Sequence, residues 1–332
     1  MAPNLKLPSG APELNADEYL KQLCGQYLHS YVAAGGSAVK LVVTDSDETT
    51  AYFSRGLAEA AGDNEYLHLR LDAAQTRLQL IDELFFAVCR QIDWIALAAR
   101  YLRQVYRDLD IPADESVPPA EAVPVRRVAE ANGMHAGELY RTIRRTLERR
   151  LLGEPTLLRQ FGTAMLRLCH SLLGWTGHDE EDRDIVLRWL SGRSVPVAQL
   201  RTVGLSSRIG RHHARYMFTS LTSWVQLTGH PGTVVELDLT RIGVARRPTA
   251  VARRGFYYTK AAALDTFEIL RQFIDGVDDL FAGLLVVTVP HQMAVDGQRG
   301  LPAYHALYLR VADDVYDHGR ANPLGSLVRI AR

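Results

Sequence analysis

The sequence predicts an α/β fold built on a parallel sheet. Two observations indicate it: stretches of strand character alternate with stretches of helical periodicity, and the strand stretches are apolar along most of their length, as buried parallel strands are. The predicted strands are residues 38–43, 65–72, 232–238, 283–289 and 325–330. Because crossovers between parallel strands are right-handed, this alternation predicts a sheet with helices on both faces.

Helical periodicity fills the intervals between these strands, and it dominates the middle of the chain. The predicted helical stretches are 17–31, 76–109, 139–152, 157–173, 180–191, 206–227 and 260–275. A Pro- and Glu-containing break at 112–124 is the best linker candidate. The expected organisation is a flexible arm (1–16), the first half of a core (17–73), a helical insert (74–230) and the second half of the core (231–332).

Composition describes an ordinary globular protein of 332 residues, with 47% hydrophobic and 23% charged residues. No apolar run is long enough to span a membrane and the first residues do not resemble a signal peptide, so we expect a cytoplasmic protein. The three cysteines lie far apart, which argues against a disulfide framework and a zinc site.

The turn after the first strand is the most informative segment. In a P-loop protein the pattern G-x-x-x-x-G-K-[ST] stands here, and its backbone N–H groups and lysine hold the phosphates. This chain has no glycine or lysine between Thr44 and Ala51, and it has three carboxylates instead. The residues of this degenerate phosphate loop are Thr44, Asp45, Thr49, Thr50 and Ala51. The carboxylates could bind a cation, but acids at the start of a helix more often stabilise its N-terminus.

The third strand ends in Asp238, followed by Leu239. An aspartate at such a strand end can hold Mg²⁺ through water, as in a Walker B motif, but Leu239 stands where an ATPase has its water-activating glutamate. The adjacent pair His212 and His213 would point about 100° apart on a helix, so it is a poor metal site. We identify no catalytic residue and no metal site.

Arginines are concentrated in stretches that lack acidic residues. The chain has 34 arginines and four lysines, and a basic run on a helix is usually a solvated face. Two of these stretches also contain aromatic residues, a combination that suits phosphate contacts and stacking on bases. The candidate DNA-contacting residues are Arg201, Arg208, Arg211, Arg215, Arg246, Arg247, Arg253 and Arg254.

Three segments carry a family resemblance: Gly35–Val43, Tyr258–Asp275, and the C-terminal stretch from Arg299 to Pro323. With them the chain resembles the P-loop ATP-binding proteins of bacterial BREX phage-defence systems, in the AAA+-like branch of P-loop NTPases. The resemblance implies a three-layer αβα core, a five-stranded parallel sheet of order 5-1-4-3-2 and a large helical insertion. It also implies that Arg299 and Arg310 could act as sensor or finger arginines.

These observations lead to one functional hypothesis and two alternatives. The leading hypothesis is a non-hydrolysing pseudo-ATPase that serves as adaptor or scaffold for a partner, a helicase or ATPase subunit of the defence system, with DNA as a further partner and no cofactor. The first alternative is an ATPase that binds ATP and Mg²⁺ through an unconventional loop. The second is a DNA-binding module. Homo- and hetero-oligomers both remain open.

Overall fold

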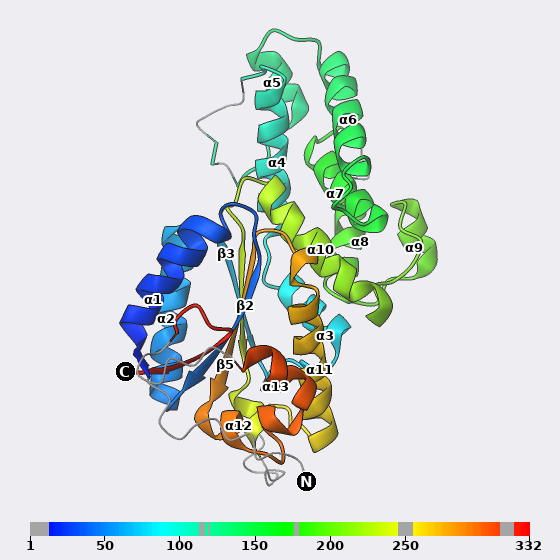
Figure 1. The fold of residues 1–332 in the computed structure, drawn as a ribbon. Coiled ribbons are helices and arrows are strands. Elements are labelled where there is room, and N and C mark those ends of the chain that lie inside the picture. Colours follow the sequence, from blue (N-terminus) through cyan, green and yellow to red (C-terminus); the bar gives the residue numbers. More distant parts are fainter. Residues whose placement is uncertain (1–12, 113–116, 119, 176–178, 245–254, 313–321) are drawn as a thin grey trace. The chain divides into compact units, whose positions relative to one another are not determined.

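The computed structural model describes residues 13–112, 117–118, 120–175, 179–244, 255–312 and 322–332 (Figure 1). The chain divides into two compact units. Unit 1 comprises Met1–Leu84 together with Pro231–Arg332, and unit 2 comprises Phe85–His230. Unit 1 therefore combines two segments that are far apart in the sequence, and it contains every strand of the sheet.

Unit 1 is built on a six-stranded, fully parallel sheet of order β1-β6-β2-β5-β4-β3. The strands are β1 (Leu14–Asn15), β2 (Ala38–Thr44), β3 (Leu67–Asp72), β4 (Thr233–Asp238), β5 (Gly283–Pro290) and β6 (Leu327–Ala331). The α/β class is confirmed. The predicted count of five strands is wrong. The predicted strands correspond to β2–β6, so the predicted order 5-1-4-3-2 is found as β6-β2-β5-β4-β3 within the longer observed order. The added strand β1 pairs with Ile330 and Ala331 at the edge of the sheet.

Helices cover both faces of this sheet (Figure 1). On one face lie α1 (Ala16–Leu23) and α2 (Asp47–Asp63), and on the other lies α11 (Lys260–Asp275). Beneath α1 and α2, the rings of Tyr19 and Phe53 stack with centroids 5.9 Å apart and are shielded from solvent by the apolar side chains of the strands. The described residues of unit 1 also form the π-helix η1 (Cys24–Tyr31), α12 (His291–Val295), α13 (His305–Val311) and the short 3₁₀ turns Thr240–Gly243, Val277–Asp279 and Leu301–Ala303.

The regular secondary structure among the described residues of unit 2 consists of helices. Its helices are α4 (Trp94–Asp108), α5 (Val125–Ala131), α6 (Ala136–Leu152), α7 (Arg159–Leu172), α8 (Asp179–Leu190), α9 (Val197–Thr202) and α10 (Arg211–Leu227), and α3 (Ile81–Cys89) crosses the boundary between the units.

The single long helix predicted over 76–109 is wrong, because the chain breaks between α3 and α4. The side chain of Asp93 accepts a hydrogen bond from the Ala96 amide at 2.9 Å and so starts a new helix. The helix predicted over 206–227 likewise begins later, at Arg211, after Gly210.

No helix among the described residues is long and apolar enough to cross a bilayer. In the same part of the chain, no group of three or more His, Cys, Asp and Glu side chains is placed to hold a metal ion. The three cysteines are free thiols.

Candidate functional site

The connection between β2 and α2 is the place where a P-loop protein would hold phosphate. Here it consists of only Asp45 and Ser46. The Ser46 hydroxyl accepts a hydrogen bond from the Thr49 amide at 3.1 Å, and the Ser46 carbonyl accepts one from the Thr50 amide at 3.0 Å. A phosphate site at a helix N-terminus depends on amides that point at the ligand. These two amides are already bonded to Ser46.

The threonine hydroxyls of this junction are also bonded within the protein. Thr44 and Thr50 lie with their hydroxyl oxygens 2.7 Å apart, and the Thr50 hydroxyl donates to the Ser46 carbonyl at 3.0 Å. The Thr49 hydroxyl lies 2.9 Å from that of Ser46. All three threonines are buried, and Ala51 is exposed on α2. The structure therefore brings these candidates together, but as a closed network of hydroxyl groups.

Acidic side chains cover the outside of the same junction. Asp45, Asp47 and Glu48 are exposed. Arg332 pairs with Glu48, and its guanidinium carbon lies 5.0 Å from the centre of the Tyr52 ring. Carboxylates in the first turn stabilise a helix through its dipole, but they repel a triphosphate. The residues present at this junction do not fit a nucleotide triphosphate held as a P-loop holds it.

At the carboxyl end of β4, Asp238 is held by the chain itself. The Arg70 guanidinium donates to Asp238 Oδ2 at 3.1 Å, and the Thr240 amide donates to Oδ1 at 2.9 Å. Arg70 comes from β3, which is paired in register with β4. The next residue, Leu239, is fully buried. Both oxygens of the candidate magnesium-binding carboxylate thus have partners within the protein.

A second carboxylate on β4, Glu236, escaped the sequence reasoning. It is fully buried on the face covered by α2, where it accepts a hydrogen bond from Ser54 at 2.9 Å. Glu236 also lies 3.5 Å from Arg70 and 3.6 Å from His68, both on β3. A glutamate inside an apolar strand is the only local sign of such a cluster, because its partners are distant in the sequence. Arg70 thereby contacts two carboxylates, Glu236 and Asp238.

The candidate sensor arginines are both bonded within unit 1. Arg299 donates to the Tyr258 carbonyl at 2.7 Å. Arg310 pairs with Asp275 at the end of α11 and donates to the Ala306 carbonyl at 2.6 Å. Each arginine therefore connects segments of the C-terminal half of the core.

Two of the three segments that carry the family resemblance are linked by one polar network. Arg271 donates two hydrogen bonds to Glu268 and thereby lowers the pKa of that carboxyl to about 2. Tyr304 donates to the same carboxylate at 2.5 Å, and Arg271 also pairs with Asp275. This network joins α11 to the segment that leads into α13.

The described DNA-contacting candidates all lie in unit 2. Arg201 is exposed on α9, and Arg211 and Arg215 stand one turn apart on α10. The Arg208 guanidinium donates to the Val195 carbonyl at 3.1 Å. The other candidates, Arg246, Arg247, Arg253 and Arg254, lie outside the described residues.

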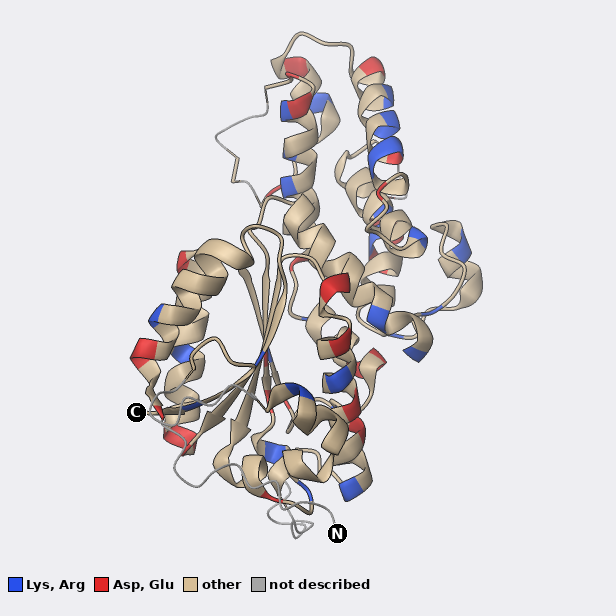
Figure 2. Cartoon of the chain, in the orientation of Figure 1, with Lys and Arg blue, Asp and Glu red and all other residues tan. Residues whose placement is uncertain are grey.

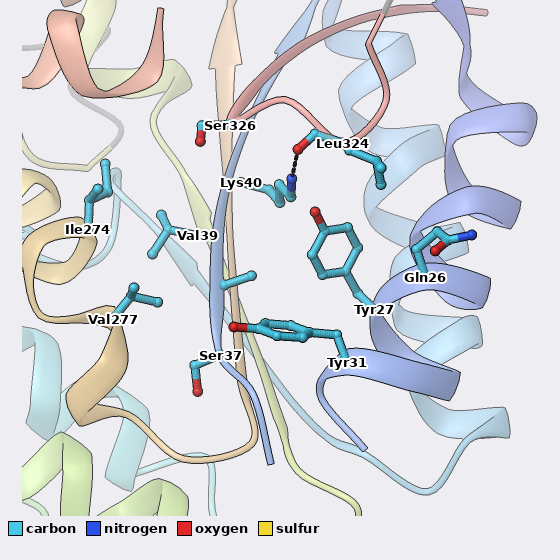
Figure 3. A pocket seen from close by; sticks show the side chains of 11 residues that line it. Gln26, Tyr27, Tyr31, Ser37, Val39, Lys40, Ile274, Val277, Leu324 and Ser326 are labelled. Carbon is cyan, nitrogen blue, oxygen red and sulfur yellow. Dashed lines mark hydrogen bonds between the residues drawn. The ribbon is translucent and has the colours of Figure 1, made fainter. Parts of the chain in front are cut away.

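An open cavity of about 460 Å³ lies at the amino end of β2, the end opposite the junction with α2 (Figure 3). Tyr27 and Tyr31 of the π-helix form one wall. The buried Lys40 ammonium donates to the carbonyls of Leu324 and Gly325 at 2.6 and 2.9 Å, and it lies 4.5 Å from the centre of the Tyr27 ring. Lys40 thus fastens the segment before β6 to the sheet, and it is far along β2 from where a P-loop lysine would act.

Comparison with known proteins identifies a family. A family model described as "BREX system ATP-binding protein BrxC/D" matches residues 125–332, more than half of the chain. The match includes β4, β5, β6 and the α11 network, whereas the β2–α2 junction precedes it. No curated protein and no solved structure matches the chain significantly. On the family match, the chain belongs to the family of BREX system ATP-binding proteins.

Proposed function

We propose that this protein is a non-hydrolysing member of its family, and that it serves as an adaptor or scaffold within a bacterial anti-phage defence assembly. The observation that carries the proposal is the two-residue connection between β2 and α2. The Thr49 and Thr50 amides bond to Ser46, the Thr44 and Thr50 hydroxyls bond to each other, and the outer surface is acidic. A triphosphate would find neither the glycines nor the lysine of a P-loop there, and it would meet charge of its own sign.

The state of Asp238 supports the same proposal. An aspartate that positions hydrated Mg²⁺ must have free lone pairs facing the nucleotide. In this protein a cation is already built in, because the Arg70 guanidinium contacts Asp238 and Glu236 together. Magnesium would have to compete with a charge that is covalently part of the chain.

Leu239 stands where hydrolysis would require a general base. A general base must lie within hydrogen-bond reach of the attacking water. A buried leucine at this position can neither accept the proton of a water nor orient it. We therefore expect this unit to bind a partner protein and not to hydrolyse nucleotide.

The partners that follow from this proposal are other proteins of the defence system, such as a helicase or an active ATPase subunit. Membership of the family supports this class of partner. Copurification of the tagged protein from a host that carries the complete system would identify the partner.

The first test is calorimetric titration of the purified protein with ATP and Mg²⁺, and then with ADP, together with thermal melting at millimolar nucleotide. We expect neither heat of binding nor a rise in melting temperature, because a ligand that binds only the folded state must raise it. The matched control is Asp238→Asn, which should behave like the wild type. Saturable binding that Asp238→Asn weakens would contradict the proposal and favour an ATPase with an unconventional loop.

A further inference from the structure

Unit 2 contains two helices joined by a tight, well-ordered turn. α5 ends at Ala131 and α6 begins at Ala136. Gly133 takes the left-handed conformation with φ 63°, and the Met134 amide donates back to the Ala129 carbonyl at 2.9 Å. This is the Schellman arrangement, which ends a helix and sets the direction of the next. A short glycine-containing turn between two helices is how helix–turn–helix proteins present their second helix.

The inner face of α6 is fixed in the core of unit 2. Leu139, Ile143, Leu147 and Leu151 are at most 2% exposed, and they recur at the spacing of one helix face. Among the residues between them, Thr146 is also buried, and the others are exposed or half-buried. Figure 2 shows basic residues recurring along this helix.

Three arginines, Arg141, Arg145 and Arg149, follow one another at intervals of four residues on the exposed side of α6. On a helix, this spacing separates neighbours by about 6 Å along the axis and gives a row about 12 Å long. Like charges at this spacing destabilise a helix by about 0.2–0.5 kcal/mol per pair. The row is thus unfavourable for the isolated protein.

The other two arginines of α6 behave differently. Arg144 pairs with Glu148 at 2.9 Å, and Arg150 pairs with Asp108 at 2.6 Å. Throughout the part of the chain that the structure describes, Arg141, Arg145 and Arg149 make no ion pair. Besides Glu148, the acidic residue of α6 is Glu138, so the exposed surface of this helix keeps an excess of positive charge.

The aromatic side chains near the row are occupied by one another. Tyr140 stacks on Trp175 with ring centres 4.6 Å apart, and the Arg126 guanidinium carbon lies 4.6 Å from the centre of the Trp175 ring. Single-strand binding needs aromatic faces that are open to bases. The Trp175 ring already has two partners within the protein, which favours contacts to a phosphate backbone.

We propose that α6 docks on duplex DNA and that Arg141, Arg145 and Arg149 contact its phosphates. The major groove of B-DNA admits an α-helix, and a helix that follows a tight turn can lie along it. Arginine is suited to this role because its planar guanidinium can form two parallel hydrogen bonds with a phosphate. This surface is distinct from Arg201–Arg215, and the proposal does not depend on whether the protein hydrolyses ATP.

The test measures binding of the full-length protein to a fluorescent duplex by anisotropy, over a range of salt concentrations. The variant replaces Arg141, Arg145 and Arg149 by Gln. Loss of three phosphate contacts should lower the slope of log K against log salt by about 2.7. When the salt concentration rises from about 50 to about 200 mM, the fold loss of affinity should then be about 40 times smaller for the variant than for the wild type.

The matched control replaces three exposed basic residues outside α6, Lys21, Arg55 and Arg193, by Gln and so removes the same net charge. We expect it to keep most of the wild-type salt slope. Equal losses in both variants would reduce the effect to net charge and overturn the proposal, as would wild-type binding by the α6 variant or no duplex binding at low salt. Equal affinity for single-stranded DNA or for polyglutamate would overturn the assignment to duplex DNA.

Circular dichroism melting keeps the test interpretable. Because the substitutions remove like-charge repulsion at exposed positions, the α6 variant should melt no lower than the wild type. A clearly lower melting temperature together with lost binding would assign the three arginines to folding rather than to DNA.

Discussion

His170 on α7 should make the stability of unit 2 depend on pH. Burial, and next the positive charge of Arg167, lowers the pKa of His170 to about 4. Its Nε2 atom is buried without a hydrogen-bond partner among the described residues. The folded protein therefore keeps this imidazole neutral at pH values where the unfolded chain protonates it.

The sign and size of the effect follow from linkage. The unfolded imidazole has a pKa of about 6.5, so between there and about pH 4 the unfolded state binds the extra proton and the free energy of unfolding falls as the pH falls. The difference between the two pKa values corresponds to about 3.4 kcal/mol of unfolding free energy. About 2 kcal/mol of this free energy is lost by about pH 5. Above about pH 6.5 the contribution is fully present.

The assay is urea unfolding at about pH 7 and about pH 5 for the wild type and for His170→Gln, which cannot titrate. Tryptophan fluorescence reports on the right unit, because every tryptophan of the chain lies in unit 2: Trp94, Trp175, Trp189 and Trp224. The variant should lose about 2 kcal/mol less than the wild type between the two pH values. The same loss in both proteins would refute the reasoning, since His170 would then titrate normally in the folded state.

Three further substitutions test unit 1. Ser46→Ala removes the cap of α2 and should destabilise that helix by about 1 kcal/mol, seen as faster hydrogen exchange of its first turn. Lys40→Met removes the ammonium that donates to the carbonyls of Leu324 and Gly325. Loss of a charged hydrogen bond costs about 1.5–3 kcal/mol, so hydrogen exchange in the segment before β6 should become faster. Phe53→Ala empties a fully buried position and should lower the free energy of unfolding by about 3–5 kcal/mol in calorimetry.

Conservative substitutions at the same three positions separate these specific effects from nonspecific destabilisation. Ser46→Thr should keep the cap, so exchange as fast as in the alanine variant would argue against capping. Lys40→Arg keeps a charged donor and should protect the segment before β6 better than methionine does. Phe53→Leu should cost less than alanine, and equal losses would show that volume does not set the stability at this position.

Elements with strong local signals were predictable from the sequence. The helix predicted over 260–275 is confirmed at both ends, because the Thr259 hydroxyl caps its start at the Ala262 amide and Gly276 follows its end. The apolar run 283–289 is confirmed as β5, one residue longer. The break between α3 and α4 was missed because apolar residues continue at helical spacing across it, while Asp93 alone starts the new helix.

By itself, the sequence determined the α/β class, the loss of the P-loop glycines and lysine, and the family. These depend on residue types at short spacing, which a linear pattern contains. Only the tertiary structure decided that Asp238 is held by Arg70, 168 residues earlier, and that Glu236 is buried with Ser54. It also decided that β1 extends the sheet. Such contacts follow from strand register and from the packing of a helix on a sheet, so residues distant in the sequence become neighbours only when the sheet forms.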